Sequence, residues 1–220
     1  MPTRYRAVGA ITLVVGGAAV LLQYVVTPLS GDMTSKGLVA QVTEHHTAMG
    51  WALALDFPVM LAAPAFLYIG HLAQARTSTL ASVATAFLFF PFVLSLPAVM
   101  GLDGLAFLAG SEPEKASMTQ LVDSWTSSAW FAFSLLPYLL LQVIGAILMA
   151  VALLRTRTVP GWVAVGTGVW PLLAIAGQES GVQVIGVIGY AVLFATWVCF
   201  AMNLVRSSQS TEVAPDLVTA

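Results

Sequence analysis

The sequence contains very few charged residues. Of its 220 residues, 8% are charged and 59% are hydrophobic, and the mean hydropathy is +0.91. An average soluble domain carries roughly a quarter charged residues, and a water-soluble fold of this size has too little interior to bury so much apolar side chain. The composition therefore predicts an integral membrane protein, whose excess apolar surface faces lipid.

Cysteine, basic residues and metal-binding motifs are also scarce. The single cysteine, Cys199, excludes an internal disulfide and a redox-active cysteine pair, and its apolar surroundings predict a small buried side chain. Eight lysines and arginines and a net charge of −2 argue against a nucleic-acid partner. The spacings HExxH and HxxxH are absent, so no zinc site is expected.

The long apolar runs lack the groups that several membrane chemistries require. No lysine lies in such a run, which excludes a retinal Schiff base, and there is no arginine repeat of the voltage-sensor kind. The sequence also lacks a Gly-x-Ser-x-Gly motif in an apolar run with a partner histidine, and paired aspartate-rich motifs for diphosphate and magnesium.

Six apolar stretches have about the 20 residues that a helix needs to cross a bilayer. The first is too long for the apolar core of a secretion signal. We predict an all-α membrane domain over residues 1–206 and a disordered polar tail over residues 207–220. A partial insertion at Gly104–Gly110 would raise the number of spans from six to seven. The six stretches are Ala7–Val26, Trp51–Leu72, Ala81–Leu102, Ala129–Leu153, Gly161–Ala176 and Val182–Leu204.

The basic residues predict the orientation of the bundle. With six spans, both termini lie on one side, and Lys36 and Lys115 fall on the other. Because basic loops stay in the cytoplasm, we expect both termini to be cytoplasmic and the protein to lie in the plasma membrane. The basic residues on the side of the termini are Arg4, Arg6, Arg76, Arg155, Arg157 and Arg206.

Two long connections on the predicted outer side have amphipathic patterns. In Gly31–Gly50 apolar residues recur at Leu38, Val39, Val42 and Met49. Ser111–Trp125 opens with a capping box of Ser111 and Glu114 and continues with Met118, Leu121, Val122 and Trp125 on one helical face. We expect two short helices packed on the bundle, with a lid as the alternative.

Three acidic residues have similar predicted depths near the outer boundary. Asp56 should lie about 8 Å below it at 1.5 Å per residue, Asp103 follows the third stretch, and Glu179 lies between the last two. Desolvation and mutual repulsion favour a protonated carboxyl group, which could act as a general acid. The alternatives are a packing hydrogen bond for Asp56 and ordinary solvation for the other two. His45 or His46 could donate a hydrogen bond to one of these carboxylates.

Aromatic residues and prolines are frequent in the same stretches. Prolines kink helices and open gaps between them, and aromatic faces stabilise cations. Lipid-facing rings and interfacial belts are the alternative for many of the aromatic residues. The candidates for lining a substrate pocket are Phe90, Tyr138, Trp170, Tyr190, Trp197 and Asp103.

In size, number of apolar stretches and placement of Asp56 and Glu179, the chain resembles the small membrane-bound terpene cyclases of actinobacteria, the drimane-type indole sesquiterpene cyclases. The resemblance implies that Asp56 and Glu179 are the proton donor and its helper. It also implies a prenylated aromatic substrate, such as a farnesylindole or its epoxide, and neither a metal nor another cofactor.

The alternative function is a non-enzymatic membrane protein, such as a small permease, a carrier subunit or a partner in a complex. A carrier needs a continuous polar path, whereas the predicted inner half of the bundle has almost no ionisable group besides His71. This asymmetry favours the enzyme. The expected partners are membrane lipid and a lipophilic small molecule, and the oligomeric state stays open.

Overall fold

The computed structural model describes residues 3–27, 34–74, 77–112 and 116–212, and within these ranges it is all-α. The all-α part of the predicted fold class is thus confirmed for the described residues. Their helices are α1 (Thr3–Val26), α2 (Ser35–Glu44), α3 (His46–Val59), α4 (Ala62–Ala73), α5 (Ser78–Ser111), α6 (Ala116–Thr126), α7 (Ala129–Thr156), α8 (Gly161–Ser180) and α9 (Gln183–Glu212).

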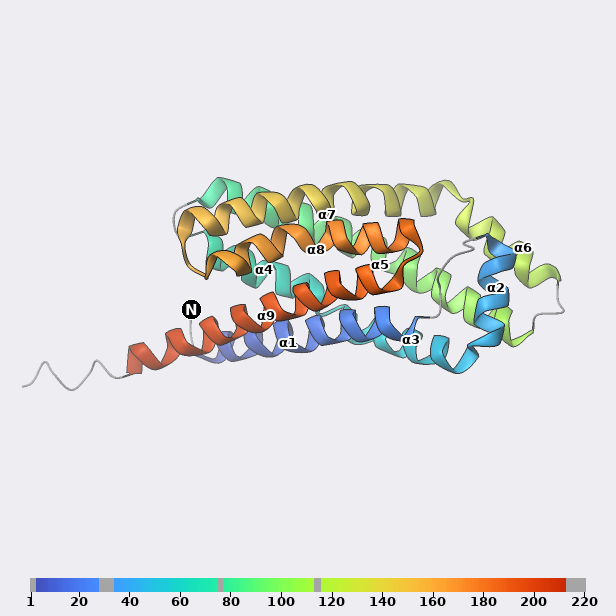
Figure 1. Ribbon diagram of the computed structural model, residues 1–220, viewed down its shortest axis with the longest axis horizontal. Coiled ribbons are helices and arrows are strands. Elements are labelled where there is room, and N and C mark those ends of the chain that lie inside the picture. Colours follow the sequence, from blue (N-terminus) through green and yellow to red (C-terminus); the bar gives the residue numbers. More distant parts are fainter. Residues whose placement is uncertain (1–2, 28–33, 75–76, 113–115, 213–220) are drawn as a thin grey trace, which may run out of the picture.

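The long helices form one elongated bundle, and two short helices cover one of its ends. Helix α9 packs between α1 and α8, and α8 packs between α9 and α7 (Figure 1). Helices α2 and α6 lie at the end remote from the start of α1, whereas α1 starts and α9 finishes at the other end (Figure 1). The two expected amphipathic connections are therefore helical, and they form a cap.

Among the described residues, four helices are long and apolar enough to cross a membrane: α1, α5, α7 and α9. Helices α3 and α4 together pass the same test as a bent pair, which gives up to five segments. The fifth predicted stretch, Gly161–Ala176, corresponds to α8, a 20-residue helix that is not among these segments. The sixth stretch corresponds to α9. Residues 104–110 continue α5 as far as Ser111, so they form no separate insertion. Helix α9 runs on to Glu212, and residues 213–220 of the predicted tail lie outside the described residues.

The second predicted stretch, Trp51–Leu72, is not one continuous helix. It is divided into α3 and α4, which are bent by 40° relative to each other. Pro64 has no N–H to donate to the carbonyl of Met60, and its ring clashes with that carbonyl in a regular helix. The break packs against α1 at Gly16, where a Cβ atom would lie 3.1 Å from the carbonyl carbon of Leu61.

The cap is built from both predicted amphipathic segments, and the predicted capping box of Ser111 and Glu114 falls partly outside the described residues. Ser111 ends α5, where its hydroxyl donates to the carbonyl of Leu108, and Glu114 lies outside the described residues. Val122 of α6 is buried, whereas Leu121 on the predicted apolar face is 48% exposed. The side chain of Ser35 on α2 donates to Asp123 on α6 over 2.9 Å, which ties the two cap helices together.

The buried apolar side chains form two separate clusters. The cap cluster joins α2, α3, the end of α5 and α6, and consists of Leu38, Val39, Val42, Met49, Ala52, Ala106, Ala109 and Val122. The bundle cluster fills the long helices, and its largest members include Leu13, Phe66, Leu88, Met149, Leu153, Trp170, Trp197 and Phe200. The polar residues described below lie at the boundary between these two clusters.

Helices α8 and α9 approach each other most closely through a pair of glycines. A Cβ atom on Gly177 would overlap the backbone nitrogen of Gly186 and lie 2.6 Å from its Cα atom. A Cβ atom on Gly186 would in turn overlap the hydroxyl group of Tyr24 on α1. The contact among α1, α8 and α9 therefore depends on the absence of side chains at both positions.

We predict that Gly177→Ala lowers the stability of the bundle by about 1–3 kcal/mol, because backbone atoms cannot move aside as a flexible side chain can. Gly104→Ala in α5 is the matched control, since no neighbouring atom lies within 4 Å of the place that its Cβ would take; it should be neutral or stabilising by up to about 1 kcal/mol. Thermal unfolding in detergent measures both. Equal stability of the two variants would contradict this packing.

Candidate functional site

Two carboxyl groups are buried together inside the bundle. Asp56 on α3 is 1% exposed and Asp103 on α5 is 5% exposed. The two groups are close enough to interact electrostatically. The side-chain amide of Gln23 on α1 donates to Oδ1 of Asp56. Three helices thus contribute one polar residue each to a common site, which we call the polar layer (Gln23, Asp56 and Asp103).

The polar layer lies at the boundary between the two apolar clusters. Along each of the three helices, its polar residue falls between a residue that packs in the bundle cluster and one that packs in the cap cluster. Gln23 lies between Val20 and Val26, Asp56 between Val59 and Ala52, and Asp103 between Leu96 and Ala106. Polar side chains therefore take the place of apolar ones at the boundary between the two clusters.

One oxygen of Asp56 is left without a partner. Its Oδ2 atom is buried and has no hydrogen bond to any described residue. A carboxylate can accept several hydrogen bonds, and an unpaired buried polar atom costs free energy. The hydrogen bond from Gln23 fixes one oxygen, so the other is the atom that can hold a proton or contact a ligand.

Three tyrosines continue the site into the bundle. Tyr24 follows Gln23 on α1, and its ring centroid lies 4.6 Å from that of Tyr190 on α9. Tyr190 lies 5.9 Å from Trp170 on α8, and Tyr138 on α7 packs against the same bundle cluster as Tyr190. Three of the predicted lining residues, Tyr138, Trp170 and Tyr190, are thus brought together, and Tyr24 joins them.

Two other predicted lining residues have different surroundings. Trp197 is buried in the bundle cluster, where its ring packs against Phe66 with centroids 5.4 Å apart. Phe90 is 61% exposed, so it faces the outside of the bundle. Leu88 and Phe92 lie on the buried face of α5, whereas Phe90 lies on its exposed face.

The structure brings Asp103, rather than Glu179, into the buried setting of Asp56. Glu179 is exposed in the last turn of α8, next to the turn at Gly181. The predicted pairing of Asp56 with Glu179 depends on similar depth alone, and depth does not determine which way a side chain points. A helix end beside a turn leaves a long charged side chain free to reach solvent.

The histidines do not reach the carboxylates as expected. His46 stacks on Phe107 with ring centroids 4.2 Å apart, and its buried Nε2 atom has no hydrogen-bond partner among the described residues. His45 is exposed. Within the described ranges, no group of three or more His, Cys, Asp or Glu residues is placed to hold a metal ion.

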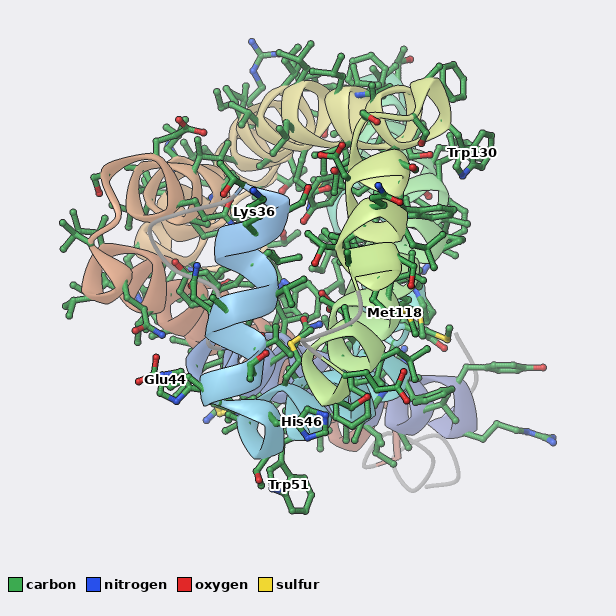
Figure 2. All side chains as sticks on the ribbon, turned by 90° about the vertical axis from the view of Figure 1, so that its right-hand side faces the viewer. Lys36, Glu44, His46, Trp51, Met118 and Trp130 are labelled. Carbon is green, nitrogen blue, oxygen red and sulfur yellow. The ribbon has the colours of Figure 1, made fainter. Side chains whose placement is uncertain are left out.

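Two hollows lie on the surface of the cap end. A groove of about 750 Å³ runs between α2 and α6, with Lys36 and Glu44 at the two ends of its α2 side (Figure 2). A second hollow of about 410 Å³ lies beside His46, Trp51 and Phe107. Figure 2 shows α2 and α6 crossing this end of the bundle.

Sequence reasoning missed Gln23 and Tyr24. Gln23 is the only amide in the first apolar stretch, and a lone amide in such a run indicates a polar partner on another helix. Comparisons of the chain with protein-family models, with curated proteins and with solved structures gave no match.

We predict that Gln23 and Asp56 are energetically coupled. Gln23→Leu and Asp56→Leu should each destabilise the protein, because each leaves the other's polar group unpaired. The double variant should lose less than the sum of the two, with a coupling of about 1 kcal/mol. Unfolding by denaturant in micelles measures this cycle, and Gln178→Leu on exposed α8 surface is the control. Strict additivity would contradict the contact.

Proposed function

We propose that the chain is a six-span membrane protein with both termini in the cytoplasm. The bent pair α3–α4 counts as one segment, and α8 as another, because 20 residues extend about 30 Å. An even number of crossings agrees with the start of α1 and the finish of α9 at one end of the bundle (Figure 1). Arg4, Arg6, Arg155 and Arg206 belong to helix ends on that side, and basic residues stay in the cytoplasm.

Thiol labelling tests this topology. In a Cys199→Ser background, we predict that Lys36→Cys reacts with a membrane-impermeant maleimide on intact cells, whereas Arg155→Cys reacts only after permeabilisation. Both native side chains are exposed, so both thiols should be accessible in the folded protein. The topology places three crossings, α3–α4, α5 and α7, between the two positions. Labelling of both positions from the outside would reject this odd number of crossings, and the reverse pattern would reject the orientation.

We propose that the protein is an acid-initiated cyclase of a lipophilic prenylated aromatic, with Asp56 as the proton donor. The observation that carries the proposal is the burial of Asp56 beside Asp103, with one Asp56 oxygen bonded to Gln23 and the other unpaired. Two neighbouring carboxyl groups in an apolar interior resist simultaneous ionisation when no cation lies beside them, which favours a protonated form of one of them. Asp103 takes the helper role that the resemblance gives to Glu179.

The proposed reaction needs no co-reactant. The Oδ2–H bond of Asp56 breaks as its proton is transferred to a terminal alkene carbon or an epoxide oxygen of the substrate. The carbocation then forms a ring by accepting the electron pair of an internal alkene. Loss of a proton from the cyclised cation to the carboxylate pair restores the acid, so the net reaction is an isomerisation.

The surrounding rings suit a cationic intermediate. Tyr24, Tyr190 and Trp170 form a chain of rings in which neighbouring centroids lie less than 6 Å apart, and aromatic faces attract cations by about 2 kcal/mol when water is excluded. The bundle cluster keeps water away from the cation, which would otherwise be quenched to an alcohol. A lipophilic substrate reaches such a site from the bilayer.

We predict that Asp56→Asn lowers product formation at least about 10²-fold, because an amide cannot supply the proton. Membranes containing the protein are supplied with farnesylindole or its epoxide, and cyclised products are measured by mass spectrometry. Asp103→Asn should also lower the rate, whereas Glu179→Gln, at an exposed position, should retain it.

The outcome decides between the enzyme and the non-enzymatic alternative. Full activity of Asp56→Asn rejects the assigned acid, and loss of activity in Glu179→Gln rejects the helper role of Asp103. If wild-type membranes convert neither substrate, the cyclase proposal fails for this substrate class, and a small permease, a carrier subunit or a partner in a complex becomes the better explanation.

A further inference from the structure

A buried amide in the middle of α7 has no protein partner. Gln142 is 3% exposed, and both its Oε1 and Nε2 atoms are buried without a hydrogen bond to any described residue. Because its side chain is enclosed by the bundle, it cannot reach lipid headgroups or a neighbouring protein. Unpaired buried polar groups are rare in native proteins, and each calls for a ligand, a water or another explanation.

Two buried serines of α5 and α7 donate their hydroxyl hydrogens within their own helices. The hydroxyl of Ser134, two turns earlier on the same face of α7, donates to the carbonyl of Trp130 over 2.9 Å. Ser95 of α5 donates to the carbonyl of Phe92 over 3.0 Å. Each serine thus uses its one hydroxyl hydrogen within its own helix, so neither donates to the carbonyl oxygen of the Gln142 side chain.

Gln142 and Tyr138 share a face of α7, since they are four residues apart. The ring of Tyr138 lies 6.3 Å from that of Phe92 on α5. One turn beyond Gln142, Gly145 packs directly on α5, where a Cβ atom would lie 2.9 Å from the Cβ of Phe87. The amide therefore lies on the face of α7 that is turned toward the bundle interior.

The neighbours of Gln142 on this face of α7 are apolar or aromatic. Tyr138 and Ala146, four residues to either side of Gln142, both pack in the bundle cluster. Tyr190 of α9 packs against the same cluster, and its ring contacts that of Tyr24.

We infer that Gln142, together with Tyr138, binds a hydroxyl group at one end of a lipophilic ligand. A hydroxyl group both donates and accepts, so it can pair with Oε1 and Nε2 of the amide at once. A charged group would gain no counter-ion there and would lose its hydration. The inference deepens the proposed function, on which the choice of a prenyl chain rests.

The experiment compares two probes that differ in one hydroxyl group, farnesol and farnesene, in lipid nanodiscs. Ligand-induced stabilisation should be greater for farnesol than for farnesene with the wild-type protein. In Gln142→Met the affinity for farnesol should fall about tenfold, and the two probes should become equivalent. Without ligand, Gln142→Met should melt at the same or a higher temperature than the wild type, because a buried unpaired amide is removed.

Each outcome either supports or overturns the inference. Gln178→Met, at an exposed position, should keep the preference for farnesol. Equal stabilisation of the wild type by the two probes, no stabilisation by either, or a preference that persists in Gln142→Met overturns the inference. A lower melting temperature in Gln142→Met, or failure of both Gln142→Met and Gln142→Leu to fold, shows a structural amide and also overturns it.

The outcome of this binding experiment can be distinguished from the outcome of the cyclase test. A hydroxyl preference that depends on Gln142, in a protein that cyclises nothing, supports the binding site and rejects the enzyme. Cyclisation that depends on Asp56, without a hydroxyl preference, supports the enzyme and rejects the binding site.

Discussion

The hydrogen bond from Gln23 to Asp56 is the interaction on which the rest of the site depends. A carboxyl group enclosed by apolar helices must be hydrogen-bonded or neutral, because water cannot stabilise its charge there. Gln23 supplies that bond from α1 and thereby fixes α1 against α3. The same stretch of α1 carries Tyr24, which Gly186 of α9 accommodates. One amide therefore determines where three helices meet and where the apolar packing is interrupted.

The positions of the helices follow from the sequence, whereas their breaks do not. Each apolar stretch forms a helix because a chain in lipid must satisfy its own backbone hydrogen bonds. Prolines lie in several stretches, yet Pro91 and Pro97 leave α5 continuous over 34 residues, while α3 and α4 separate near Pro64. The difference depends on what packs against the proline, and composition does not contain that information.

For the acidic residues, the sequence predicts the depth in the bundle but not the direction in which each side chain points. Counting residues along each helix places Asp56, Asp103 and Glu179 near one level, and Asp56 is indeed buried. Which acid faces Asp56 depends on how α5 and α8 are rotated about their axes, and this rotation is set by contacts among all the helices. The sequence also displays Gln142 as a rare amide in an apolar run. Only the packing around it reveals that its polar atoms lack partners.

The break between α3 and α4 also bears on how the protein enters the bilayer during synthesis. At about 21 Å and 18 Å, neither half-helix alone spans a hydrocarbon core of about 30 Å. Each half leaves polar backbone ends at membrane depth, so a translocon releases the pair into lipid at a penalty unless another segment shields the junction. Helix α1 precedes the pair along the chain, and its Gly16 packs directly against the junction at Leu61. Contact with α1 therefore covers part of the backbone that the break exposes.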